Sequence, residues 1–257
     1  MKIATWNING IGSRLQHVID WCGDTRPDVL CLQETKIIDT KFPAAKLRAV
    51  GYRYVEFFGE KAYNGVAILS KAPIADITKG FPRDNADAPR RLIAGTIAGI
   101  RIINVYAPHG TALGSDKMRF KLDWFQQLRK YLDKNCSTGD PLILCGDLNV
   151  APHELDVWKP SLWKDKTHFS KPERAAIHDL KRWGFVDLFR QMNYDVQEFT
   201  WWSRFHNDFE KDRGLRIDFV WASPALAERC IDCWIDREPR GWEHPSDHAP
   251  VVAEFNL

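Results

Sequence analysis

Residues 142–152 read Leu-Ile-Leu-Cys-Gly-Asp-Leu-Asn-Val-Ala-Pro, an apolar run followed by an acid and an amide. Four consecutive apolar residues predict a strand that is covered on both faces, because a half-exposed strand would alternate apolar with polar residues. Asp147 and Asn149 follow this run closely. Burying a carboxylate costs free energy unless it is paired or hydrogen-bonded, so these two side chains are candidates for a chemical role.

Short apolar runs of the same kind recur in both halves of the chain and predict further strands. They lie at Val29–Leu32, Gly65–Leu69, Ile102–Tyr106, Ile217–Trp221 and Val251–Phe255. Many short strands with a few helices between them are typical of an α/β (α+β) fold in which two sheets pack together and helices cover the outside. We expect each half of the chain to supply one sheet. No linker or low-complexity tract divides the sequence, so residues 1–257 are predicted to form a single domain.

Three stretches between these runs predict helices. An apolar stripe with spacings of three and four residues consists of Met118, Leu122, Phe125, Leu128 and Leu132. We expect the polar face of this helix to carry Lys117, Arg119, Lys121 and Arg129. Ser170 and Glu173 have the spacing of a capping box at the start of a second helix, which Gly184 ends. A shorter helix is expected over residues 15–21.

The composition excludes several classes of protein. The 257 residues include 36 Lys and Arg against 34 Asp and Glu, with 44% hydrophobic and 27% charged residues, which excludes a disordered or fibrous chain. No apolar run approaches the ~18 residues of a membrane helix, and amides near the N-terminus interrupt any signal peptide, so we expect a cytoplasmic protein without membrane contacts. The cysteines are expected to be reduced, and Cys230 and Cys233 lack the second ligand pair that a zinc site needs.

Acids, amides, histidines and a tyrosine stand at the ends of most predicted strands. Besides Asp147 and Asn149, they are Asn7, Asn9, Glu34, Tyr106, His109, Asp218, Asp247 and His248. Any one of them could be an ordinary turn or a hydrogen-bonded strand end. Asp218 is harder to explain in this way, because it lies inside the run Ile217–Trp221 and needs a buried partner. The repeated pattern indicates a polar site that the ends of several strands build together.

Five motifs occur in an order that resembles a known family. They are Trp6-Asn-Ile-Asn-Gly10, Leu32-Gln-Glu-Thr-Lys36, Gly146-Asp-Leu-Asn-Val-Ala-Pro152, Gly214-Leu-Arg-Ile-Asp218 and Pro245-Ser-Asp-His-Ala-Pro250. Together they are specific, and they resemble exonuclease III and the abasic endonucleases of the DNase I-like phosphodiesterase superfamily. The resemblance covers residues 2–256 and implies a four-layered sandwich of two mixed sheets flanked by helices. It also places the active site in a cleft where the strand ends of both sheets meet.

The resemblance implies a metal site for the hydrolysis of phosphodiesters in duplex DNA. Glu34 would bind Mg²⁺, or Mn²⁺ in its place. Asn7, Asn9 and Asp247 would lie nearby as oxygen donors, which suit a hard cation that keeps several waters. The metal would polarise the phosphate and the leaving group.

The resemblance also implies catalytic roles for five residues. Asp147 would orient or deprotonate the attacking water, and Asn149 would donate a hydrogen bond to a phosphate oxygen. His248 would contact the scissile phosphate, while Asp218 holds its other ring nitrogen. Tyr106 would act beside the phosphate either as a hydrogen-bond donor or as a phenolate.

Contacts with DNA are expected from a second group of residues. The resemblance places Trp201 and Leu215 in the pocket for an abasic or terminal nucleotide, and we expect Trp202 to lie in the core. The phosphate contacts expected are those of His109, Lys117 and the pair Arg90 and Arg91.

His168 departs from the family pattern, since related sequences carry a small residue such as Ser near this position. We expect its ring to narrow the mouth of the pocket and to hinder an internal, flipped-out abasic nucleotide, while a 3′ terminus stays accessible. The predicted function is therefore that of a metal-dependent DNA repair nuclease with 3′→5′ exonuclease, 3′-phosphatase and abasic-endonuclease activities. The balance between them would be shifted towards 3′ ends.

Other functions remain as alternatives. The protein could act predominantly as an abasic endonuclease. A relative that hydrolyses phosphoinositides or sphingomyelin would share the acidic core, but the match through Gly214–Asp218 and Trp201 argues against it. A non-catalytic DNA-binding protein would be expected to have lost Glu34, Asp147, Asn149 or His248, and none is lost. We expect a monomer, because the site is built within one chain and no apolar surface stripe stands out.

Overall fold

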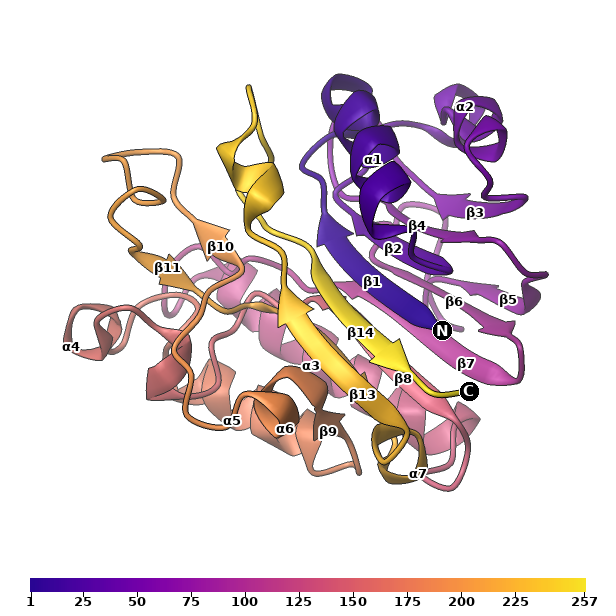
Figure 1. Ribbon diagram of the computed structural model, residues 1–257. Coiled ribbons are helices and arrows are strands. Elements are labelled where there is room, and N and C mark those ends of the chain that lie inside the picture. Colours follow the sequence, from indigo (N-terminus) through magenta and orange to yellow (C-terminus); the bar gives the residue numbers. More distant parts are fainter.

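The computed structural model describes residues 1–257 and contains two six-stranded sheets that pack face to face (Figure 1). The first sheet consists of β1 (Lys2–Asn7), β2 (Val29–Gln33), β3 (Tyr54–Phe58), β4 (Val66–Ser70), β13 (Cys230–Ile235) and β14 (Val251–Phe255). The second consists of β5 (Ala75–Lys79), β6 (Leu92–Ile97), β7 (Ile100–Tyr106), β8 (Leu142–Asp147), β9 (Val186–Asp187) and β12 (Asp218–Ala222). A separate ribbon is formed by β10 (Trp201–Trp202) and β11 (Gly214–Leu215). Both large sheets are mixed, with β1 parallel to β2 and β7 parallel to β8.

Helices cover the outer face of each sheet, which confirms the expected four layers. The helices α1 (Ile11–Thr25) and α2 (Ala44–Ala49) lie on the first sheet, and α3 (Asp116–Asn135) and α5 (Lys171–Lys181) lie on the second. The remaining helices are α4 (Pro160–Trp163), α6 (Leu188–Met192) and α7 (Pro224–Ala227), with 3₁₀ turns at Asp39–Lys41, Glu154–Asp156 and Glu238–Gly241. No helix is long and apolar enough to span a membrane.

Three apolar layers hold these four layers together, and β2 illustrates how. Val29 and Cys31 face the core between the sheets, whereas Leu30 and Leu32 face the helices on the outside. All five residues of β2 are buried. A strand with apolar contacts on both faces has no position for a solvated side chain, which explains the run without alternation.

The prediction that each half of the chain supplies one sheet is wrong. The first sheet has the order β13-β14-β1-β2-β4-β3, so the last two strands of the chain join the first four. β14 runs antiparallel to β1, with Ala253 opposite Ile3. Since β1 is almost entirely buried, its backbone groups need hydrogen-bonding strands on both sides. β14 supplies the second neighbour, and nothing in the local pattern of either strand indicates this pairing.

Strand directions bring the polar strand ends to one edge of the sandwich. The second sheet has the order β5-β6-β7-β8-β12-β9. In it, Tyr106 of β7 and Asp218 of β12 both lie opposite Asp147 at the end of β8. In the first sheet, Asn7 ends β1 beside Gln33 at the end of β2, and β14 begins at the same edge. Gly146 is required here, because its φ is +127° and an added Cβ would lie 2.0 Å from the Val105 carbonyl oxygen.

The three predicted helices are present, but one residue was predicted on the wrong face of its helix. The capping box of Ser170 and Glu173 starts α5 as expected, and the helix expected over residues 15–21 is the longer α1. Lys121 was predicted on the polar face of α3, but it has no exposed area, because its ammonium pairs with Glu173. Position 121 lies three residues after Met118, on the same buried face of the helix.

Candidate active site

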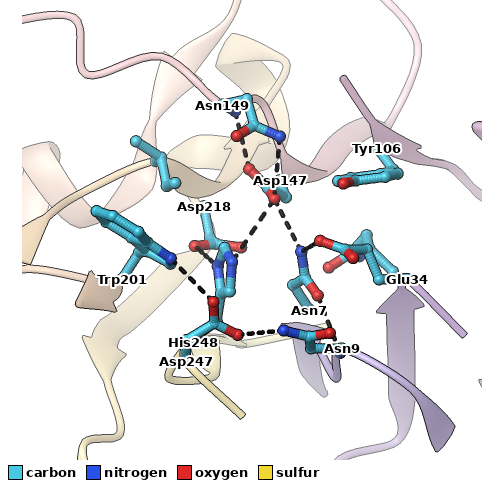
Figure 2. Close-up of polar contacts among 12 residues, drawn as sticks. Asn7, Asn9, Glu34, Tyr106, Asp147, Asn149, Trp201, Asp218, Asp247 and His248 are labelled. Atoms are coloured by element: carbon cyan, nitrogen blue, oxygen red, sulfur yellow. Dashed lines mark hydrogen bonds and ion pairs between the residues drawn. The ribbon is translucent and has the colours of Figure 1, made fainter. Parts of the chain in front are cut away.

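The polar residues at the strand ends form one cluster that joins the two sheets (Figure 2). The Asn7 amide donates to Glu34 Oε1 and to Asp147 Oδ2, each at 2.9 Å. Because Asn7 belongs to β1 and Asp147 to β8, this amide spans the junction of the sheets. Ligand atoms of Glu34, Asp147 and His248 lie within 4.8 Å of one another. The close-up contains every residue that we assigned to the metal or to catalysis: Asn7, Asn9, Glu34, Tyr106, Asp147, Asn149, Asp218, Asp247 and His248.

Asp147 is held from two sides and is suited to take up a proton. Asn149 donates its backbone N–H to Oδ1 at 2.8 Å and its side-chain amide to Oδ2 at 3.3 Å. The same amide donates to the Ala107 carbonyl at 2.9 Å, which fixes its orientation. Burial and the nearby Asp218 carboxylate raise the pKa of Asp147 above its usual range. A carboxylate with a raised pKa has the proton affinity that a general base needs.

His248 and Asp218 form a buried pair beside Asp147. Nδ1 of His248 lies 2.8 Å from Asp218 Oδ2, and Nε2 lies 3.9 Å from Asp147 Oδ2. Burial alone would lower the pKa of His248, but the Asp218 carboxylate outweighs burial and raises this pKa to about 10. The imidazolium therefore faces the centre of the cluster, where it could stabilise an anionic oxygen. The pair also supplies the partner that the buried Asp218 carboxylate required.

Glu34 is the carboxylate best placed to hold a cation. Its Oε1 accepts from Asn7, and its Oε2 lies 2.7 Å from the Lys36 ammonium. Burial would raise the pKa of Glu34, but Lys36 and Asn7 together lower it, so the side chain stays ionised. Glu34 and Lys36 have left-handed backbones with φ of 51° and 53°, a costly conformation that is typical of functional sites.

The donor set fits a hard divalent cation. Four carboxylates converge here, those of Glu34, Asp147, Asp218 and Asp247. Three cationic side chains lie against them, those of Lys36, His248 and Arg204. The Lys36 ammonium already lies against Glu34, where positive charge is favoured. Carboxylate oxygens are ligands that Mg²⁺ prefers, and Glu34 and Asp147 present them. The Asn7 amide turns its NH₂ towards both carboxylates, while its oxygen accepts from the backbone N–H of Asn9 at 3.1 Å.

Asp247 and Asn9 support the cluster from its outer side. Asp247 Oδ1 accepts from the Asn9 amide at 2.6 Å and from Arg204 at 3.2 Å, while Oδ2 accepts from the Trp201 indole at 3.2 Å. The oxygen of Asn9 in turn accepts from Lys36. Asn9 is linked to Glu34 through Lys36, and Asp247 is linked to it only through Asn9, so the polar atoms of both residues orient other side chains.

Tyr106 lies beside Glu34 and is held in place by Arg91. The guanidinium carbon of Arg91 is 4.6 Å from the centre of the Tyr106 ring, and Arg91 donates to the Tyr106 carbonyl at 3.1 Å. Burial, together with the carboxylates of Glu34 and Asp147, raises the pKa of Tyr106. This environment favours the neutral phenol, a hydrogen-bond donor, over a phenolate.

A cavity of about 460 Å³ opens beside the cluster. Its walls include the rings of Trp163, Trp201, His109 and His168. The two indoles approach edge to face with ring centres 6.5 Å apart, and the His168 ring is 5.9 Å from that of Trp201. Because Trp201 also donates to Asp247, the cavity and the acidic cluster share a wall. A pocket with aromatic walls suits a sugar or a base.

His168 forms the inner wall of this cavity, since it is only 4% exposed. Its Nδ1 lies 2.8 Å from the carbonyl oxygen of Asn149, which can only accept, so Nδ1 carries the proton. Its Nε2 then accepts from Nε2–H of His109 at 3.1 Å. Nδ1 of His109 accepts from the backbone N–H of Thr111, which agrees with this tautomer. The only ring donor of His109 is therefore directed at His168, although His109 was expected to donate to a phosphate.

We predict that His168 titrates below the ~6.5 of a free histidine. Burial, with the positive charge of Lys121, lowers the pKa of His168 well below that value. The unfolded chain would take up a proton at this residue near pH 6.5, whereas the folded protein would not. The free energy of unfolding should therefore fall as the pH drops below 6.5. NMR titration of the ring, assigned by its loss in His168→Asn, measures the midpoint, and a midpoint at or above 6.5 contradicts this assignment.

The remaining residues considered for the DNA-binding surface lie in the core, beside the cavity or on the surface. Trp202 has no exposed area, which confirms its place in the core. Leu215 has none either. It is the cross-strand partner of Trp201 in the β10–β11 ribbon and belongs to the small apolar cluster against which Trp201 packs, but it does not line the cavity. Lys117 is exposed on the first turn of α3. The guanidinium of Arg90 packs 4.2 Å from the ring centre of Phe58.

Two residues of the site were not assigned from the sequence. Lys36 stands two positions after Glu34 within one motif, and this spacing was the only signal for it. Trp163 gave no signal, because its contacts are with Trp201 and His168 from other segments of the chain.

Several known proteins are similar to this chain over almost its whole length. Residues 4–248 match the model of the endonuclease/exonuclease/phosphatase family. The chain is 36% identical to exodeoxyribonuclease III of Haemophilus influenzae, over 99% of this chain and 100% of the relative. An AP endonuclease structure from Archaeoglobus fulgidus is 41% identical with a TM-score of 0.97, and each chain is covered completely. A 3′-5′ exonuclease from Neisseria meningitidis is also 41% identical over both whole chains, with a TM-score of 0.96. A further Neisseria structure is described as a 3′ phosphatase bound to a product DNA hairpin.

Proposed function

The chain belongs to the endonuclease/exonuclease/phosphatase family and is a repair nuclease of the exonuclease III type, and on this premise we propose that it acts mainly at 3′ ends of duplex DNA. The observation that carries this proposal is the position of His168. Its ring fills the inner wall of the cavity next to Asn149, where an internal nucleotide turned out of the duplex would need space. A 3′-terminal nucleotide can approach without being turned out of a continuous strand. Relatives described as a 3′-5′ exonuclease and a 3′ phosphatase support this choice.

This metal-dependent nuclease is proposed to use Mg²⁺, which Mn²⁺ can replace. Glu34 would hold the ion through its carboxylate oxygens, with Asn7, Asn9 and Asp247 orienting the groups around it. When bound, the ion supplies positive charge for the phosphate and for the leaving oxygen.

The side chains of the cluster have separate roles in hydrolysis. Asp147 takes the proton from the attacking water, because its raised pKa and its two bonds from Asn149 prepare and orient it. The imidazolium of His248, held by Asp218, stabilises charge on the phosphate. Tyr106 donates from its neutral phenol. The 3.3 Å bond from the Asn149 amide to Asp147 is the weakest of these contacts, so a phosphate oxygen can replace it as acceptor.

A second candidate function is predominant incision at internal abasic sites. The similarity to an AP endonuclease over the whole chain favours it, as does the aromatic pocket beside Trp201. The two functions differ in whether the pocket admits a nucleotide from within a strand.

The His168→Ser variant tests this difference. We expect the ratio of internal abasic incision to 3′-end removal to rise about tenfold, the effect of ~1.4 kcal/mol on the relative barriers, because the ring no longer fills the inner wall. Single-turnover assays with two labelled duplexes measure this ratio. In the control His109→Gln, the amide nitrogen can take the place of Nε2–H as donor to His168, and the ratio should stay unchanged. An unchanged ratio in His168→Ser would count against the proposed role of the ring.

We also propose that the protein works as a monomer with residues 1–257 in one domain, since β14 from the C-terminus pairs with β1 and all site residues come from one chain. Light scattering at assay concentrations measures the mass directly, for comparison with the 29.7 kDa of one chain.

A further inference from the structure

A buried ion pair lies directly behind the active site. Lys121 comes from α3 and Glu173 from α5, both side chains have no exposed area, and Nζ lies 2.5 Å from Oε1. A buried ion pair of this kind is weak evidence for stability, because an apolar pair of similar volume is often as stable. Stability alone therefore does not explain why Lys121 and Glu173 are buried here, and their hydrogen bonds to neighbouring segments indicate another role.

The ammonium of Lys121 holds the segments that follow β7 and β8. Besides Glu173, it donates to the carbonyl of Asn149 at 2.7 Å and to the carbonyl of His109 at 3.1 Å. These three bonds use all three donors of the ammonium. Asn149 is the residue whose backbone N–H and side chain orient the Asp147 carboxylate.

The carboxylate of Glu173 fixes the other side of the same region. It accepts from the backbone N–H of His168 at 3.0 Å and from the N–H and hydroxyl of Ser170 at 3.2 and 2.5 Å. His168 in turn donates from Nδ1 to the Asn149 carbonyl at 2.8 Å. The ion pair and His168 therefore converge on one backbone carbonyl, that of Asn149.

We propose that Lys121 is a positioning residue of the nuclease: paired with Glu173, it fixes the backbone of Asn149 and thereby the direction of the Asp147 carboxylate. This inference rests on the proposed role of Asp147 as the base. Lys121 has no exposed area and cannot touch DNA, so its loss should lower kcat and leave KM for DNA nearly unchanged. A shift of the base by about 1 Å can cost on the order of 100-fold in rate.

Two double variants separate positioning from folding. Both carry Glu173→Gln, so no unpaired charge is buried, and they differ in Lys121→Met against Lys121→Gln, side chains of equal length of which only Gln can donate. We expect similar Tm values for the two. For a duplex with a recessed 3′ end, kcat should fall about 100-fold in the Met variant, and the Gln variant should recover at least tenfold of that loss. Equal kcat values at similar Tm overturn the proposal.

Two further measurements cover the cases in which the Met variant does not fold or in which Asp147 is not the base. If the Met variant does not fold, the Gln double variant is compared with the wild type, since its side chain is one atom shorter than Lys. Support then requires both a lower kcat and a shifted amide resonance of Asn149, and the absence of either overturns the proposal. Asp147→Asn is assayed alongside: if it stays active, the proposed function fails, whereas an inactive Asp147→Asn with equal double variants overturns only the positioning role.

Discussion

Replacing Asp147 with Asn should lower kcat for hydrolysis of a 3′-terminal phosphodiester by about 10³- to 10⁴-fold, at the upper end of what a general base contributes. The amide can keep the bond from the Asn149 backbone, but it cannot take up a proton. Binding of duplex DNA should persist, because no phosphate-binding group is removed. Single-turnover kinetics and a binding titration with the same labelled duplex measure both effects.

Asp133→Asn is the matched control for this substitution. Asp133 lies on the exposed face of α3 and pairs only with Arg129, so the same chemical change there should leave kcat within about twofold. Activity of Asp147→Asn within tenfold of the wild type would rule out the assignment of Asp147 as the base.

Arg216→Met should lower the free energy of unfolding by about 3–5 kcal/mol, the usual cost of removing one partner of a buried ion pair. Arg216 is 1% exposed and donates to both oxygens of Asp187 at 3.0 and 2.9 Å and to Asp156 at 2.7 Å. Burial would raise the pKa of Asp187, but Arg216 outweighs burial and lowers it, so removal of Arg216 leaves a buried carboxylate without its counter-ion. Because Arg216 precedes Asp218 by two residues, activity should fall as well.

Urea unfolding measures this loss, and Arg129→Met provides the control. Arg129 pairs with Asp133 and Asp179 at the surface, where such pairs contribute about 0–1 kcal/mol. If both substitutions cost less than about 1 kcal/mol, the Arg216 network does not stabilise the fold in the way described.

Much of the fold can be predicted from local sequence patterns. Runs such as Leu142–Cys145 have apolar side chains on both faces, so they indicate strands inside a layered structure without any knowledge of their neighbours. The strand ends indicated the site, because polar side chains such as those of Asp147 and Asn149 are costly to bury unless they have partners. The gathering of these residues at one edge follows from the strand directions, whereas their roles in catalysis stay predictions.

The features that sequence did not indicate depend on partners far apart in the chain. β14 pairs with β1 through backbone hydrogen bonds. Backbone groups are the same in almost every residue, so the sequence of side chains does not indicate which strands pair. Lys121 was assigned to solvent because a lysine within a helix is usually exposed, and only the position of Glu173 on another helix makes its burial possible. The donor of His109 is directed at His168, a contact between loops 59 residues apart.

The proposed function requires that one metal-dependent site works preferentially on 3′ ends. The most direct test is a single duplex with a recessed 3′ end on one strand and an abasic analogue inside the other, each strand carrying its own label. With wild-type protein and Mg²⁺, we predict resection of the 3′ end well before internal incision, and no product with EDTA or with Asp147→Asn. Internal incision that precedes resection would contradict the claim, and product in the presence of EDTA would contradict the metal site.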